Sequence, residues 1–189
     1  MNYLSGNNKI SKEAKLVGVN YVENATLGKC EIYGSKITNS IVCDGAVIIN
    51  SVLENCVVRQ NVRVGPFAYL RQNAFIEQDC RIGDFVEVKN SLLERGVKAA
   101  HHAYIGDAYV GENTNVGCGT VFANYNGKIK QKTYVGKNTF IGANTNLVAP
   151  VDIGNNCFIG AGTTIRKNLE DNTFFVGVME EKTKKINNE

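Results

Sequence analysis

The stretch TYVGKNTFIGANTNLVAPVDIGNNCFIGAGTTI, residues 133–165, repeats a six-residue pattern. An aliphatic residue recurs at every sixth position, a period that fits neither the helical 3.6 nor the simple strand period of 2. Thr139 and Ile141 are two residues apart and share a strand face, so the chain must turn at residues 142–144 before the pair recurs. Each repeat is therefore one short strand and one corner. The recurring residues are Val135, Ile141, Leu147, Ile153, Ile159 and Ile165.

Gly and Asn occupy the corners because they tolerate positive φ, and three equal corners close a triangular coil of about 18 residues. The pattern predicts an all-β fold, a parallel β-helix of the hexapeptide-repeat type. The flat sides of such a prism bury little surface alone, so we expect a symmetric oligomer, most naturally a trimer.

A five-residue spacing precedes the six-residue one. Two interpretations compete: a separate pentapeptide solenoid, or the same prism with tighter corners at Asn39-Ser40 and Asn50-Ser51. The six-residue spacing resumes from Val64 without a linker, which favours one prism from about residue 16 to 166, or about eight coils at about 18 residues each. The five-residue series is Val22, Leu27, Ile32, Ile37, Val42, Val47, Val52, Val57 and Val62.

This spacing divides the chain into four parts. We expect a polar segment at 1–15, five-residue coils at 16–62, six-residue coils with loop insertions at 63–168, and a cap and tail at 169–189. Within the last part, residues 173–178 predict a short strand, and the polar end is expected to fray.

Composition indicates a soluble, β-rich protein. The 189 residues include no Trp and carry a net charge of +3, which gives no case for nucleic acid as a partner. The six cysteines form no CxxC pair, so we expect buried, reduced thiols and a cytoplasmic location. No apolar run reaches the length of a membrane span, so we expect no membrane partner.

The six-residue spacing is interrupted at 90–103 and at 122–133. An insertion into a solenoid leaves the stack as a loop, and loops on rigid scaffolds often carry function. The first interruption holds the only histidines, His101 and His102. A neutral imidazole suits a general base near pH 7, although a surface pair without a role is the competing interpretation. Adjacent strand residues point to opposite faces, so we expect no metal site here.

Two cations are spaced by one whole coil. Arg71 and Lys89 lie 18 residues apart and should stack on neighbouring coils, either as a phosphate clamp or as two solvated charges. In the second interruption, Asn126-Gly127 predicts a tight turn, so Asn124, Tyr125 and Lys130 belong either to a functional loop or to a polar hairpin.

Residues 64–166 resemble the carboxy-terminal acetyltransferase domain of the GlmU family, bifunctional bacterial enzymes that acetylate glucosamine 1-phosphate and then uridylylate it. Nothing in these residues resembles the uridyltransferase domain, so we expect uridylylation to be absent, and the first coils look like the β-helix appended to sugar-nucleotide pyrophosphorylases. The resemblance implies a left-handed β-helix and a homotrimer. It rests on GPFAYLRQNA from Gly65, IGDFVEVKNS from Ile82, KAAHHAYIGDAYVGENTNVGCGT from Lys98, NYNGKIKQKTYVG from Asn124 and LVAPVDIGNNCFIGAGTTI from Leu147.

The resemblance also implies a role for each site residue. His101 would be the base and Asn124 would orient the amine or acetyl group. Arg71, Lys89, Tyr104, Asn115, Glu87 and Lys130 would bind the sugar phosphate, the lysine coming from a neighbouring subunit in the family. Acetyl-CoA, the co-substrate, would lie along Cys118, Tyr125, Ala143 and Ala161.

The expected function is N-acetylation of an amino-sugar phosphate, most directly glucosamine 1-phosphate, with acetyl-CoA as donor. The resemblance places this reaction in UDP-GlcNAc and cell-wall synthesis. Two alternatives stay open: another amino-sugar acceptor, or a non-catalytic subunit that binds a sugar phosphate or assembles a separate nucleotidyltransferase.

Overall fold

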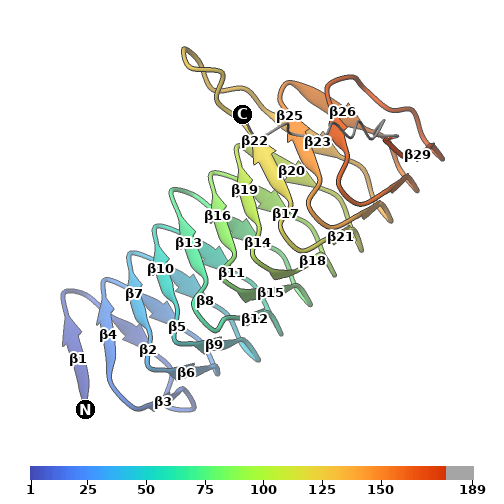
Figure 1. Ribbon diagram of the computed structural model, residues 1–189. Coiled ribbons are helices and arrows are strands. Elements are labelled where there is room, and N and C mark those ends of the chain that lie inside the picture. The colour runs from blue at the N-terminus through green and yellow to red at the C-terminus, as the bar shows by residue number, and fades with distance from the viewer. Residues whose placement is uncertain (178–189) are drawn as a thin grey trace, which may run out of the picture.

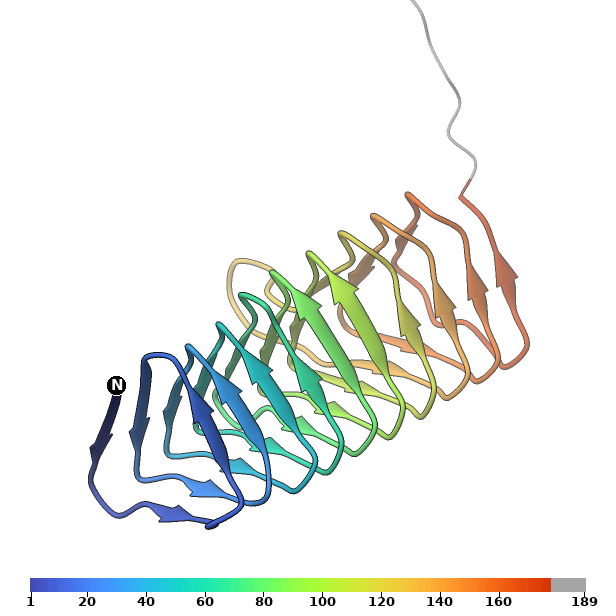
Figure 2. The ribbon, with the colours of Figure 1, turned by 90° about the horizontal axis from the view of Figure 1, so that it is seen from below.

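The computed structural model describes residues 1–177 as a stack of coils along one axis (Figures 1 and 2). The coils build three parallel sheets of ten, nine and ten strands, which form the sides of a prism. The all-β, parallel β-helix prediction is confirmed, and the part of the chain described contains no helix and so none that could span a membrane.

We name the sheets A, B and C in the order in which the chain visits them. Sheet A consists of β1 (Asn2–Ser5), β4 (Asn20–Glu23), β7 (Lys36–Thr38), β10 (Val52–Glu54), β13 (Tyr69–Arg71), β16 (Glu87–Lys89), β19 (Tyr104–Gly106), β22 (Val121–Ala123), β25 (Asn146–Val148) and β28 (Thr164–Ile165). Sheet B consists of β2 (Lys9–Ile10), β5 (Thr26–Leu27), β8 (Ile41–Val42), β11 (Val57–Val58), β14 (Phe75–Ile76), β17 (Leu92–Leu93), β20 (Ala108–Val110), β23 (Thr133–Val135) and β26 (Val151–Ile153). Sheet C consists of β3 (Lys15–Val17), β6 (Glu31–Tyr33), β9 (Val47–Ile49), β12 (Arg63–Val64), β15 (Arg81–Asp84), β18 (Lys98–His101), β21 (Asn115–Val116), β24 (Phe140–Ile141), β27 (Phe158–Ile159) and β29 (Phe174–Phe175).

The stack begins earlier than the sequence predicts. Strand β1 pairs with β4 and β2 pairs with β5, so coils start at Asn2 rather than near residue 16, and there are nine to ten instead of eight. The four residues of β1 are exposed, and β1 is the edge strand of its sheet at this end of the described stack. A strand that buries one face weakly carries little of the hydrophobic pattern from which strands are predicted.

One column of aliphatic and aromatic side chains fills the prism behind sheet A. Each member is nearly inaccessible to solvent, as the pattern of β-branched and aliphatic residues predicts. The sheets continue across residue 62 without a break, so the five-residue and six-residue parts form one stack. The column is Val22, Ile37, Leu53, Leu70, Val88, Ile105, Phe122, Leu147 and Ile165.

Part of the predicted core is shifted by one residue. Val47, Val52 and Val57 face outward, and the neighbouring Ile48, Leu53 and Val58 are fully buried. Both members of each pair are apolar, so the sequence alone leaves the register ambiguous, and a slip of one residue reverses the buried face. Since buried positions step by six residues from Val42 to Ile48, the five-residue spacing is not maintained there.

The two interruptions differ in kind. At 90–103, strands β17 and β18 stay in sheets B and C, so this interruption is not a loop insertion but a coil one residue shorter. At 122–133, the chain leaves the stack between β22 and β23, and this loop projects from the prism in Figure 1. Only the second predicted loop is confirmed.

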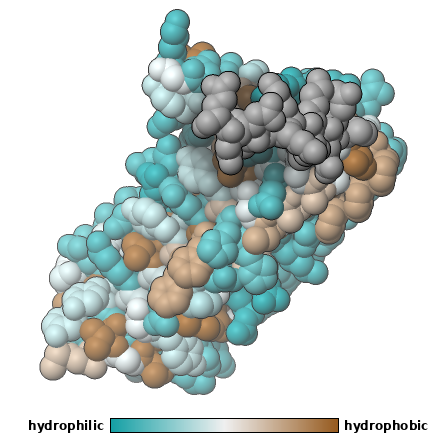
Figure 3. Space-filling model, in the orientation of Figure 1, coloured by the Kyte–Doolittle hydropathy of each residue, from teal (hydrophilic) through white to brown (hydrophobic). Residues whose placement is uncertain are grey.

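The described residues end shortly after the last strand. Within the predicted strand at 173–178, β29 spans Phe174–Phe175 and pairs with β27. The predicted cap and tail from residue 178 onward, with the lysine-bearing end, lie outside the described residues. On the face shown in Figure 3, apolar patches lie among hydrophilic surface over the N-terminal coils.

Candidate active site

The cations predicted to stack lie on neighbouring strands of sheet A. Arg71 at the end of β13 is the register partner of Lys89 at the end of β16. Strand residues alternate between faces, so both side chains leave the prism on its outer side. The one-coil spacing is therefore confirmed, although the two head groups contact different partners.

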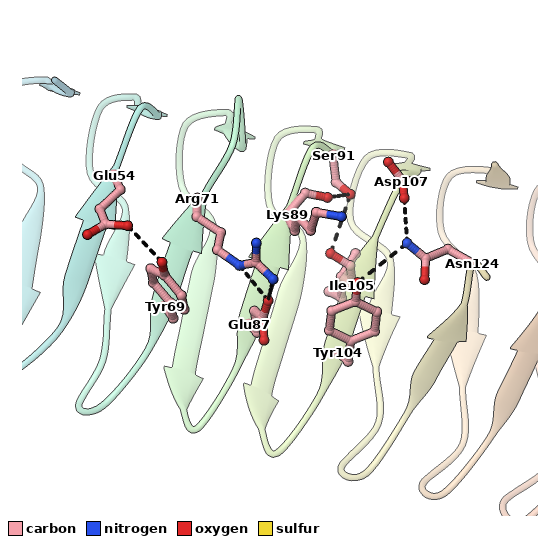
Figure 4. Close-up of polar contacts among 10 residues, drawn as sticks. All are labelled: Glu54, Tyr69, Arg71, Glu87, Lys89, Ser91, Tyr104, Ile105, Asp107 and Asn124. Carbon is pink, nitrogen blue, oxygen red and sulfur yellow. Dashed lines mark hydrogen bonds and ion pairs between the residues drawn. The ribbon is translucent and has the colours of Figure 1, made fainter. Parts of the chain in front are cut away.

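Arg71 is held by a carboxylate. Its Nε and Nη2 each lie 2.7 Å from Oε1 of Glu87, one coil above Tyr69. The guanidinium also lies 5.4 Å from the centre of the Tyr69 ring, whose hydroxyl donates to Glu54 at 2.7 Å. Figure 4 shows Arg71 reaching along the sheet toward Glu87. This contact uses only some of the N–H donors of the guanidinium, and the others are available to an anion.

Lys89 faces the corner between sheets A and B. It is only 6% exposed and lines, with Lys130 and Asp107, an open cavity of about 530 Å³. The adjacent Lys130 ammonium and burial lower the pKa of Lys89, while Asp107 opposes the shift. Two neighbouring ammonium groups beside one carboxylate leave a net positive charge, which favours an anionic ligand. Amide side chains complete the lining: Asn55, Gln72, Asn73 and Asn90.

Asp107 anchors this corner and is not among the site residues predicted from the sequence. Its carboxylate accepts amide hydrogen bonds from Asn90 at 2.5 Å and from Asn124. The Asn124 amide also reaches the Tyr104 hydroxyl at 3.4 Å, and Figure 4 shows its contacts with Asp107 and Tyr104. Burial alone would raise the pKa of Asp107, but the two amides and the nearby lysines outweigh it, and the pKa lies below its ordinary value. A spacing of 17 residues, one short coil, joins Asn90 to Asp107 and Asp107 to Asn124.

The loop after β22 brings Lys130 to this cavity. Tyr125 and Lys130 form an antiparallel bridge across the loop, and the tip is closed by N–H groups that donate to Oδ1 of Asn126. The tight turn predicted at Asn126-Gly127 is therefore present. The single chain already brings Lys130 to Lys89, where the resemblance implies a lysine from a neighbouring subunit.

His101 lies at the other end of the sheet A strands, on the corner between sheets C and A. It is the last residue of β18, and its Nδ1 lies 2.6 Å from Oδ1 of Asp84, the last residue of β15. The imidazole side chain is 55% exposed, so its other ring nitrogen is open to a ligand. The hydrogen bond with His101 lowers the pKa of Asp84 below its ordinary value. Asp84 is not among the site residues predicted from the sequence, although its spacing of 17 residues from His101, one short coil, could have identified it.

The predicted acetyl-CoA residues share this corner. Counting from the paired strands, Cys118, Ala143 and Ala161 follow His101 at the same position of successive coils. The coils approach closely here: a Cβ added to Gly117 would lie 2.6 Å from the backbone nitrogen of Ala143, so a side chain has no room. Cys118 and Ala161 are exposed along this corner.

Two predicted site residues lie apart from these groups in the single chain. Asn115 is on the outer face of sheet C, in register with Lys98 and Phe140. Tyr125 is in the projecting loop, where its hydroxyl donates to the Gly127 carbonyl at 2.7 Å, and strand β22 separates it from Cys118 along the chain.

Comparisons with known proteins agree with this architecture. Residues 132–167 match the family described as bacterial transferase hexapeptide (six repeats), and residues 52–125 match the GMPPB C-terminal domain. Bifunctional protein GlmU of Clostridioides difficile is 50% identical over 137 residues, which are 72% of this chain and 30% of that protein. GlmU of Clostridium novyi is 42% identical over 172 residues, or 89% of this chain and 38% of that protein.

Solved structures give more distant similarities. The polysialic acid O-acetyltransferase OatWY has 14% identity and a TM-score of 0.42, with 97% of this chain and 94% of that chain covered. LpxA, a UDP-N-acetylglucosamine acyltransferase from Bacteroides fragilis, has 18% identity and a TM-score of 0.38, with 86% and 66% covered. The chain spans about a third of the length of the GlmU proteins that it matches, from 30% to 38%. It is thus a hexapeptide-repeat parallel β-helix whose sequence resembles part of the bifunctional protein GlmU.

Proposed function

We propose that this chain is an acetyl-CoA-dependent N-acetyltransferase for an amino-sugar phosphate, most directly glucosamine 1-phosphate. The observation that carries the proposal is the placement of His101, an exposed imidazole held through Nδ1 at one end of a sheet face whose other end is cationic. The identity of 42% to 50% with GlmU over most of the chain supports this choice of reaction.

The cationic end suits the phosphate. Arg71 offers a planar fork of donors for phosphate oxygens, and Lys89 with Lys130 adds charge from the next coil and the loop. Glu87 and Tyr104 are register partners on the strands between the cations and His101, where hydroxyl groups of a sugar ring would meet them. We assign Asn115 to the acceptor as well, on the resemblance alone. Orientation of this kind supplies much of the rate enhancement in group transfer.

His101 would act as general base. An amine attacks a thioester only in its neutral form, and a base that accepts its proton keeps the nucleophile available. The new N–C bond forms at the acetyl carbon, the C–S bond breaks, and CoA leaves as the thiol after receiving the proton. Backbone N–H groups at the glycine-rich corner would stabilise the oxyanion, and Asn124 would help orient the amine or acetyl group.

Acetyl-CoA would lie along the corner that carries Cys118, Ala143 and Ala161. Small residues and close backbone stacking leave an open edge for an extended chain such as pantetheine. Tyr125 would reach this groove from another subunit, because in its own chain it follows strand β22, at the opposite end of that strand from Cys118. We therefore propose a homotrimer, in a cytoplasmic setting where acetyl-CoA is available.

The test measures thiol release from acetyl-CoA with a panel of amino sugars and their phosphates. We expect turnover with glucosamine 1-phosphate and weak or no turnover with glucosamine. Equal turnover of the two would contradict the phosphate role of Arg71 and Lys89. No turnover with any acceptor, together with saturable sugar-phosphate binding by calorimetry, would favour a non-catalytic subunit instead.

A further inference from the structure

Asp84 forms a side-chain pair with His101 that the coil geometry imposes. The two residues are register partners at the ends of β15 and β18, and the His102 N–H donates to the Asp84 carbonyl at 2.9 Å. The carboxylate and imidazole therefore face each other across one coil spacing, with Oδ1 and Nδ1 2.6 Å apart. Backbone pairing, rather than the free rotation of two surface side chains, brings them together.

A second contact fixes the same corner. The residues that follow the pair, Phe85 and His102, place their rings 4.8 Å apart, and Phe85 also stacks on Phe67 at 5.5 Å. Phe67, Phe85 and His102 all have positive φ, which directs these side chains outward at successive corners. The His101 backbone is thus held by ladder hydrogen bonds and by an aromatic stack beside it.

The charge state of Asp84 determines what His101 can do. The hydrogen bond with His101 holds the pKa of Asp84 below its ordinary value, so the carboxylate is ionised at neutral pH and can only accept a hydrogen bond. A neutral His101 must then carry its proton on Nδ1, and the lone pair lies on Nε2. Nε2 is the other ring nitrogen of this exposed side chain, and it makes no hydrogen bond with the residues that the structure describes.

We propose that Asp84 is the positioning residue of the acetyl transfer. It selects the Nδ1–H tautomer of His101, orients Nε2 toward the acceptor amine and stabilises the imidazolium that forms when Nε2 takes the amine proton. Asp84 itself neither gains nor loses a proton, and the proton passes from His101 to the departing CoA thiolate. This inference rests on the proposed function, in which His101 is the base.

The Asp84→Asn variant separates positioning from packing. Asparagine has nearly the same shape, but its amide N–H would donate to Nδ1 and favour the Nε2–H tautomer, which cannot accept the amine proton. We expect kcat to fall by about 10²- to 10⁴-fold with little change in the KM for acetyl-CoA. Asp84→Glu, which keeps the carboxylate, should recover part of kcat. Asp152→Asn, at an exposed aspartate on sheet B, is the matched control and should retain wild-type activity.

A spectroscopic measurement reads the tautomer directly. The chain has only two histidines, so ¹⁵N NMR of the His102→Gln variant observes His101 alone. We expect the Nδ1–H tautomer with Asp84 present and a shift to Nε2–H in the Asp84→Asn background. A wild-type Nε2–H tautomer, or an unchanged kcat in Asp84→Asn, would overturn the role of Asp84 and leave the acetyltransferase assignment standing. Failure of the wild-type protein to acetylate any acceptor would overturn that assignment, and the catalytic role of Asp84 with it.

Discussion

Arg71 lies opposite Lys89 on adjacent strands of sheet A, and yet the two cations contact different groups. The Arg71 guanidinium contacts Glu87 at 2.7 Å, and Lys89 shares a cavity with Lys130 and Asp107. A phosphate placed between the coils would accept hydrogen bonds from the N–H donors of Arg71 that Glu87 does not use, and it would relieve the repulsion between the two lysines. Both effects favour binding of a phosphorylated ligand over its neutral counterpart.

Replacing Lys89 tests this phosphate site. Lys89→Gln removes one charged contact, worth about 1.5–3 kcal/mol, so the KM for glucosamine 1-phosphate should rise about 10- to 100-fold. The KM for acetyl-CoA should change little. The matched control is Lys98→Gln, an exposed lysine on sheet C. An equal loss of affinity for glucosamine and its phosphate would argue against a phosphate contact.

Replacing His101 tests the base. His101→Ala should lower kcat for acetyl transfer by about 10²- to 10⁴-fold, the usual contribution of a general base. His102→Ala removes the adjacent imidazole, which stacks on Phe85, and should retain most activity. Thiol release under saturating substrates compares the two variants. Similar losses in both would point to a structural effect of the corner rather than proton transfer.

Replacing Asp107 tests the anchor of the cationic corner. In Asp107→Asn, an amide N–H would face the N–H groups of Asn90 and Asn124, leaving a buried donor unpaired at a cost of about 1–3 kcal/mol. Thermal and urea unfolding should both show the loss. Asp152→Asn is the exposed control, and equal stability of the two variants would contradict the network.

The same carboxylate predicts a pH dependence. The pKa of Asp107 lies below its ordinary value, so its contribution to stability is present above the unfolded-state pKa of about 3.9 and is lost as pH falls through the lower folded value. The difference in urea midpoint between the wild-type protein and Asp107→Asn should therefore be constant at neutral pH and shrink below about pH 4. A difference that grows on acidification would reverse the predicted sign.

A matched pair of substitutions tests the register of the N-terminal coils. Leu53 is fully buried and its neighbour Val52 is partly exposed, so Leu53→Ala should destabilise the protein by about 2–5 kcal/mol and Val52→Ala by much less. Urea unfolding followed by circular dichroism measures both. A larger destabilisation by Val52→Ala than by Leu53→Ala would contradict this register and support the one that a strict five-residue spacing predicts.

The sequence predicts the fold well because a prism repeats one geometric unit, and each unit needs a buried β-branched or aliphatic residue and a corner that tolerates positive φ. Prediction fails where this signal is degenerate. Val52 and Leu53 are both apolar, so either could face the core, and the short coil at residues 90–103 resembles an insertion when only six-residue steps are counted.

The site is predicted less completely than the fold. A spacing of 18 residues identifies Arg71 and Lys89, but Asp84 and Asp107 lie 17 residues from their partners, in coils shortened by one residue. The directions of charged side chains depend on neighbours brought together only by folding, as the contact of Arg71 with Glu87 shows.

The most direct test of the proposed reaction identifies its product. The protein is incubated with ¹³C-acetyl-CoA and glucosamine 1-phosphate, and the product is analysed by NMR and mass spectrometry. We predict an N-acetyl amide on the sugar phosphate, formed by the wild-type protein and nearly absent with His101→Ala. Acetyl-CoA left unreacted by the folded wild-type protein, or amide formed equally well by His101→Ala, would contradict the proposed reaction in the first case and its base in the second.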